Sequence, residues 1–123
     1  MSMLFRWLQR FAAIIAAFTA LLGVKQNTVT VSLYANPSSG YSWECSFDRQ
    51  GVMTLSDSYY KQNLTLFSDD TKDGKQYFIL KSIGEGTVNV RFKYVNSRGY
   101  VASSYTYRYS VSDTGRITLI SKT

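Results

Sequence analysis

The chain has 123 residues, a formal net charge of +6 and hydrophobic side chains at 45% of its positions, which suits one small folded domain. It contains no His and a single Cys, so imidazole metal sites, Ser-His and Cys-His catalytic pairs and an internal disulfide are excluded. Its Lys and Arg residues are spread singly along the chain, which argues against nucleic-acid binding. The composition therefore favours a binding protein that is not an enzyme and needs no cofactor.

Residues 1–24 differ in character from the rest of the chain. Arg6 and Arg10 precede an uncharged apolar run over 11–24, which is shorter than the roughly 20 residues that span a bilayer. We expect a hydrophobic helix that is either a cleaved signal peptide or a retained N-terminal membrane anchor. Either way the folded domain, residues 25–123, is expected to be secreted, periplasmic or at the cell surface.

From Thr28 onward the chain alternates apolar and polar residues with a period of two, which is typical of strands. Turn residues recur at intervals of about 8–12 positions, which indicates an all-β, immunoglobulin-like antiparallel β-sandwich of about seven to eight strands. The strands are expected at 28–34, 41–47, 52–55, 59–67, 75–82, 87–94, 104–111 and 116–120.

Two features that resemble a reactive thiol and a metal site have simpler interpretations. Cys45 shares a strand face with Trp43 and Phe47, so we expect a buried small hydrophobe, since the chain offers no His to activate a thiol. The acidic stretch Asp69, Asp70 and Asp73 lacks the spacing of a known calcium loop, so we expect no metal there but a solvated hairpin tip.

The most informative stretch is Asn36-Pro37-Ser38-Ser39-Gly40-Tyr41-Ser42-Trp43. Asn36 can fold back onto the backbone, Pro37 fixes its own φ and Gly40 permits a positive φ, so a stiff loop with a narrow tip is expected. From these residues alone, the loop is either an ordinary hairpin turn or a preformed wedge that enters a cleft without further ordering.

This stretch resembles the Asn-Pro-Thr-Thr-Gly-Tyr-x-Trp motif of the chagasin family, the I42 inhibitors of papain-like cysteine peptidases. The order of the later segments is similar too, with Gly84-Glu85-Gly86-Thr87 leading into the strand at 90–94. The resemblance covers roughly residues 25–123 and implies an exported immunoglobulin-like sandwich. It also implies three loops at one end that form a wedge and inhibit the peptidase reversibly, without a covalent bond.

The resemblance assigns a role to each loop. The central loop, which would enter the active-site cleft, comprises Asn36, Pro37, Ser38, Ser39, Gly40 and Tyr41. The second loop would grip the enzyme through Thr71, Lys72, Asp73 and Gly74, of which only Gly74 matches the family's Gly-rich sequence. The third loop usually reads Arg-Pro-Trp, and a two-residue shift places Arg98, Gly99 and Tyr100 there.

The implied partner is a papain-like cysteine peptidase, bound by a monomer, with membrane contact only through an uncleaved N-terminal segment. Because Gly99 replaces a Pro, the third loop is expected to be less preorganised than in the family. The divergent flanking loops keep an alternative open: an exported β-sandwich module that binds a cell-surface or other protein without inhibiting it.

Overall fold

The computed structural model describes residues 27–64 and 73–123, which form seven strands and one short 3-10 helix. The elements are β1 (Thr28–Ala35), η1 (Pro37–Ser39), β2 (Tyr41–Phe47), β3 (Met53–Gln62), β4 (Gly74–Ser82), β5 (Gly86–Asn96), β6 (Val101–Val111) and β7 (Ile117–Lys122). The all-β prediction is confirmed, whereas the predicted N-terminal helix lies outside the described residues. Within 27–64 and 73–123, no helix has the length and apolar character needed to cross a membrane.

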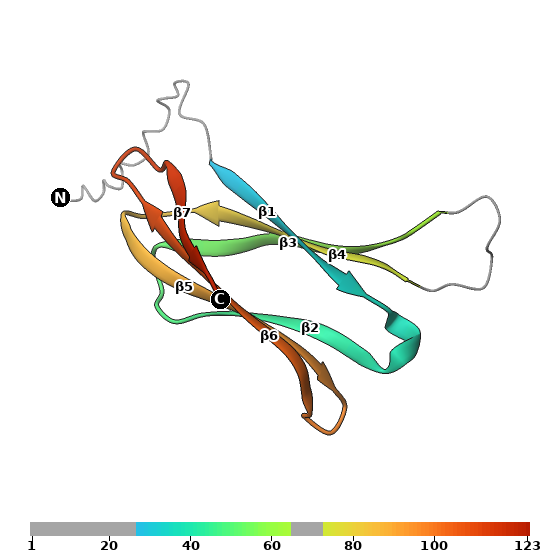
Figure 1. The fold of residues 1–123 in the computed structure, drawn as a ribbon. Coiled ribbons are helices and arrows are strands. Elements are labelled where there is room, and N and C mark those ends of the chain that lie inside the picture. Colours follow the sequence, from blue (N-terminus) through green and yellow to red (C-terminus); the bar gives the residue numbers. More distant parts are fainter. Residues whose placement is uncertain (1–26, 65–72) are drawn as a thin grey trace.

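The strands form two antiparallel sheets that pack face to face (Figure 1). One sheet has the order β1-β4-β3 and the other the order β2-β5-β6-β7. The rings of Phe78 on β4 and Phe92 on β5 meet at 5.0 Å between the sheets. The buried core comprises Val31, Leu33, Val52, Met53, Phe78, Leu80, Val88, Val90, Phe92, Tyr107, Tyr109 and Val111.

The period-two pattern places its apolar members in this core as predicted. On β5, Val88, Val90 and Phe92 are at most 1% exposed, while Arg91 between them is exposed. Full burial of each such side chain contributes about 1.5–3 kcal/mol of transfer free energy. On β6, Tyr107 and Tyr109 belong to the core, so two of the three alternating tyrosines of this strand stabilise the sandwich.

The structure corrects two boundaries. The strand expected at 52–55 and the first part of the one expected at 59–67 form one strand, β3, with a bulge at Ser56 between Leu55 and Asp57. β3 ends at Gln62, and residues 65–67 lie outside the described residues. A bulge absorbs one extra residue, so the polar stretch after Leu55 does not interrupt pairing with β4. The connection between the strands expected at 87–94 and 104–111 is shorter than those bounds imply, because β5 and β6 pair as far as Val95 and Val101.

Candidate functional site

The strand register gathers the three predicted loops at one end of the sandwich (Figure 1). Ala35 at the end of β1 pairs with Gly74 at the start of β4, and Tyr41 at the start of β2 pairs with Asn96 at the end of β5. The central loop between β1 and β2 therefore lies between the other two. Two predicted residues of the second loop, Thr71 and Lys72, lie outside the described residues.

The central loop is a single 3-10 turn held by its own residues. The Asn36 side-chain Oδ1 accepts hydrogen bonds from the Ser38 backbone N–H at 3.1 Å and the Ser38 hydroxyl at 2.6 Å. Pro37 occupies the first turn, and the Gly40 N–H donates to the Pro37 carbonyl at 3.4 Å. Gly40 has φ 84°, a conformation that a β-branched residue adopts only with strain.

Both serine hydroxyls at the tip donate within the loop. The Ser39 hydroxyl donates to the Asn36 carbonyl at 2.6 Å, and its oxygen accepts the Tyr41 backbone N–H at 3.3 Å. Ser38 uses its own hydroxyl proton on Asn36, as described above. Because both hydroxyl protons are donated inside the loop, the exposed tip offers a partner hydroxyl oxygens that chiefly accept hydrogen bonds. The same two serines also stabilise the shape of the loop.

Tyr94 on β5 supports the central loop through its hydroxyl, a role that the sequence pattern does not reveal. Its side chain is 8% exposed, and its hydroxyl accepts the Asn36 backbone N–H at 2.9 Å. The same oxygen lies 3.4 Å from the Ser39 hydroxyl and 3.4 Å from the Asn36 carbonyl. Its ring stacks on Trp43 at 4.7 Å and Tyr41 at 5.4 Å, so the loop rests on a layer of aromatic rings.

Asp73 joins the second loop to the central one. One carboxylate oxygen, Oδ1, accepts the Tyr34 hydroxyl at 2.8 Å and the Asn36 side-chain amide at 3.2 Å. The hydrogen bond to Asp73 raises the pKa of Tyr34 above its ordinary value, because the phenol donates to a negative group. Asp73 therefore fixes the geometry between two loops. No group of three metal-ligating side chains occurs in the part of the chain that the structure describes.

Gly74 serves packing within the hairpin. It is buried, pairs with Ala35 on one side and Gln62 on the other, and a Cβ there would overlap the Lys61 backbone oxygen. Only glycine permits this approach of β3 and β4. Gly74 thus positions the second loop and presents no side chain of its own.

Asn96 organises the third loop in the same way that Asn36 organises the central one. Its Oδ1 accepts the backbone N–H groups of Arg98 at 3.0 Å and Tyr100 at 2.9 Å. Gly99, with φ 86°, donates its N–H to the Asn96 carbonyl at 3.0 Å. The loop presents Arg98 and the 65% exposed Tyr100 to solvent. Gly99, in place of Pro, was expected to make this loop less ordered, and the hydrogen bonds to Asn96 compensate for that.

The chain matches a known protein family over most of its length. The sequence profile described as "Chagasin family peptidase inhibitor I42" matches residues 24–120. The chain belongs to the chagasin family. A similar solved structure is that of the cysteine protease inhibitor EhICP2 from Entamoeba histolytica, with a TM-score of 0.59 and 23% sequence identity. The match covers 66% of this chain and 75% of that one, and it supports the fold. No curated protein sequence matches the chain.

Membership of the chagasin family, which consists of peptidase inhibitors, confirms that this chain is not an enzyme. The structure meets the expectation of a buried Cys45 only in part. The side chain is half-buried against the core, and burial raises the pKa of its thiol to about 11. A thiol that stays protonated at neutral pH is a poor nucleophile.

Proposed function

We propose that this chagasin-family chain is a reversible, non-covalent inhibitor of papain-like cysteine peptidases. In this proposal the loop from Asn36 to Tyr41 enters the active-site cleft, and the second and third loops contact the walls of the cleft. The observation that carries the proposal is the hydrogen-bond network that holds the central loop in shape without a partner.

The network bears directly on affinity. A side chain or loop that becomes ordered on binding costs about 0.5–1.5 kcal/mol for each immobilised flexible group. Here Asn36 fixes the turn, Tyr94 holds it from below and Asp73 ties it to the neighbouring loop. Because the loop is already ordered, binding to a peptidase should cost little further free energy for ordering it.

The inhibitor would act by occlusion. The tip is a 3-10 turn with a positive φ at Gly40, which is unlike the extended backbone of a substrate. The third loop adds Arg98 and Tyr100, two residue types enriched among interface hot spots. No covalent step is needed, and Cys45 lies in the sheet away from the loops.

The proposal extends to location and assembly. Thr28, the first residue of β1, pairs with Lys81 at the end of the sandwich opposite the loops. A hydrophobic segment attached there, whether cleaved on export or retained in a membrane, would leave the loops accessible. We propose that the domain acts outside the cytoplasm as a monomer.

Two glycine variants test the proposal. Gly40 in the central loop and Gly51 at the opposite end have φ of 84° and 90°, and at neither glycine does any atom lie within 4 Å of the place a Cβ would take. Gly40→Val and Gly51→Val should therefore introduce similar strain, of about 1–2 kcal/mol. Residues 25–123 would be titrated against papain and cathepsin L, with thermal unfolding of each variant as the measure of folding.

We expect inhibition by the wild type, its loss in Gly40→Val, and its retention in Gly51→Val with a similar decrease in Tm. Equal inhibition by the two variants would contradict insertion of the central loop. Failure of the folded wild type to inhibit either enzyme at micromolar concentration would favour the alternative, a β-sandwich module that binds another protein.

A further inference from the structure

The outer face of the β1-β4-β3 sheet carries an unusual group of side chains next to the loops. Partners directly opposite in an antiparallel pair point to the same face, and every second residue along a strand does so too. Tyr34 pairs with Lys75, which pairs with Lys61, and in the adjacent row Tyr77 pairs with Tyr59. We call these five residues, Tyr34, Tyr59, Lys61, Lys75 and Tyr77, the lysine-tyrosine face.

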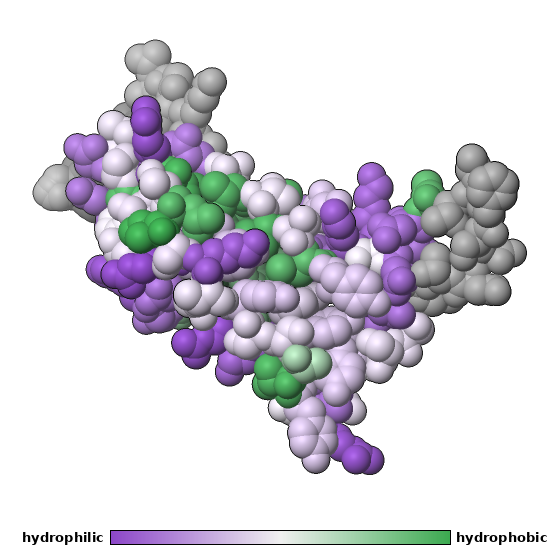
Figure 2. Space-filling model, viewed as in Figure 1, coloured by the Kyte–Doolittle hydropathy of each residue, from purple (hydrophilic) through white to green (hydrophobic). Residues whose placement is uncertain are grey.

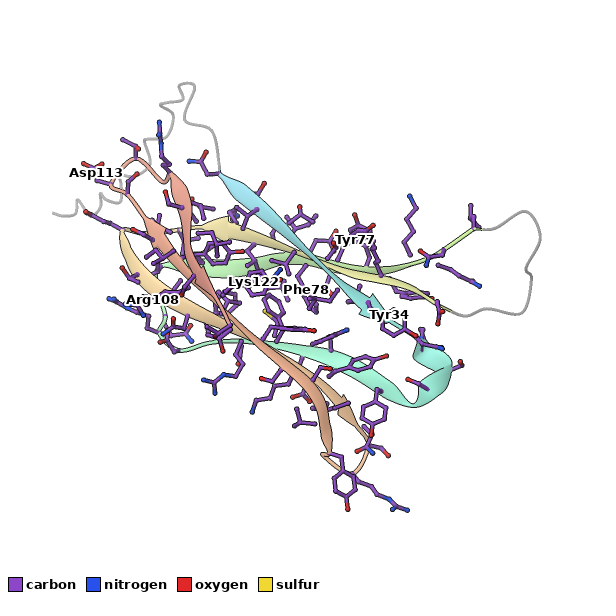
Figure 3. The ribbon with its side chains drawn as sticks, viewed as in Figure 1. Tyr34, Tyr77, Phe78, Arg108, Asp113 and Lys122 are labelled. Atoms are coloured by element: carbon purple, nitrogen blue, oxygen red, sulfur yellow. The ribbon has the colours of Figure 1, made fainter. Side chains whose placement is uncertain are left out.

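This face points away from the core. Leu33 and Phe78, which alternate with its members, are 7% and 3% exposed, so their neighbours in sequence point outward. Figure 3 shows Tyr77 and Phe78 on opposite sides of the three-stranded sheet. Tyr34 is 56% exposed and Tyr59 is 43% exposed. The face is therefore accessible to a partner.

The positions of the two lysines destabilise the fold. Lys61 and Lys75 are directly opposite each other on neighbouring strands, where like charges are destabilising. Asp57 shares their face but lies beyond the tyrosine row. Asp73, two residues before Lys75, accepts the Tyr34 hydroxyl at 2.8 Å, so the two lysines outnumber the one carboxylate beside them. In Figure 2, strongly hydrophilic side chains gather over this part of the β3–β4 hairpin. A binding partner of opposite charge would relieve the repulsion.

The tyrosines favour a protein as that partner. Tyr59 and Tyr77 stack with a centroid distance of 5.1 Å and an interplanar angle of 9°, which gives a flat and rigid surface. Exposed aromatic rings are enriched at protein interfaces, whereas lysines suit the charged rim of an interface, where they act mainly on the association rate. The row of Tyr34 and Lys75 lies one residue pair from Ala35 and Gly74, where the central and second loops begin.

We propose that the lysine-tyrosine face is a second contact surface for the inhibited peptidase and recognises an acidic flank beside its cleft. This inference rests on the proposed function and adds to it a preference among peptidases by the charge of their surface. Lys61 and Lys75, with Arg98 on the third loop, would speed the encounter with peptidases whose cleft rim is negatively charged, because long-range attraction acts mainly on the association rate.

Lys81 provides a matched control. It lies on the same strand and the same face as Lys75 but six residues further along, so about 20 Å away and beyond a Debye length of about 10 Å at 0.1 M salt. Lys61→Gln/Lys75→Gln and Lys81→Gln variants would be compared by stopped-flow association with two papain-like peptidases of opposite net charge at the assay pH.

We expect the double variant to associate about tenfold more slowly with the acidic peptidase at low salt, and to regain the wild-type rate at about 1 M salt. It should not slow with the basic peptidase, and its Tm should not fall. Lys81→Gln should change the rate less than twofold.

If the double variant associated at the wild-type rate, or if Lys81→Gln slowed association equally, the proposed role of the lysine-tyrosine face would be overturned. The proposed inhibitor function would stand. A wild type that inhibits neither enzyme would overturn both proposals.

Discussion

The hydroxyl of Tyr94 provides the sharpest test of how the central loop keeps its shape. Tyr94→Phe removes one oxygen atom and leaves the ring stacked on Trp43 and Tyr41. The deleted oxygen accepts the Asn36 N–H at 2.9 Å, within the range of a good hydrogen bond, whereas its two contacts at 3.4 Å are weaker.

The expected loss follows from that single good bond. A buried donor left without an acceptor costs about 1–3 kcal/mol, and because this N–H is only partly buried we expect about 1.5 kcal/mol. For a domain of roughly 100 residues, this corresponds to a decrease in Tm of about 6–12 °C. If the same bond holds the loop in its binding shape, the inhibition constant should rise by up to about tenfold.

Thermal unfolding and inhibition titrations of Tyr94→Phe would measure both losses. Tyr105→Phe is the matched control, because Tyr105 also stacks on Trp43, at 5.8 Å, yet is 38% exposed, and no hydrogen bond of its hydroxyl occurs within the described residues. The control should change neither quantity. A Tyr94→Phe variant that loses stability but inhibits as the wild type does would refute the link between this hydroxyl and the binding shape of the loop.

Other changes have equally specific outcomes. Asn96→Ala removes the acceptor for two backbone N–H groups and should weaken inhibition about three- to tenfold, whereas Asn96→Asp keeps an acceptor and should recover most of it. Gly74→Ala should lower Tm far more than a surface substitution, because its Cβ overlaps the Lys61 backbone; an unchanged Tm would contradict the close approach. Burial raises the pKa of Cys45 to about 11 and that of Tyr109 to about 12, so the folded state holds both protons more tightly than the unfolded state does. The contribution of these two groups to the free energy of unfolding should therefore be constant below about pH 9 and decrease between pH 9 and 12. Urea titrations at several pH values would measure this decrease, and Cys45→Ala should reduce its first part.

The sequence predicts the local chemistry of the site better than its tertiary supports. The strand at Tyr41–Phe47 has the predicted bounds, because its strict alternation and the turn before it are both local signals. The turn-forming roles expected of Asn36, Pro37 and Gly40 are likewise those that the structure shows. Each of these inferences depends on residues that are neighbours in the chain.

The supports depend on register, which local patterns do not determine. Tyr94 reads as one more apolar member of β5, and its place beneath Asn36 follows only when Tyr41 is paired with Asn96. Asp73 reads as part of a polar loop, and its bond to Asn36 depends on the pairing of β1 with β4. Contacts between residues 37 and 58 positions apart carry no signal in a single sequence.

The same physics explains how the third loop can diverge without losing order. In the family, a Pro in the third loop restricts the chain covalently, whereas here Asn96 restricts it through hydrogen bonds to Arg98 and Tyr100. Asn36 does the same for the central loop, and Asp73 joins that loop to the second one. Because Asn96 fixes the third loop, the exposed positions Arg98 and Tyr100 are free to vary with the target. Differences in affinity between peptidases should therefore come from Arg98, Tyr100 and the charge of the enzyme's cleft rim, while the scaffold beneath them stays the same.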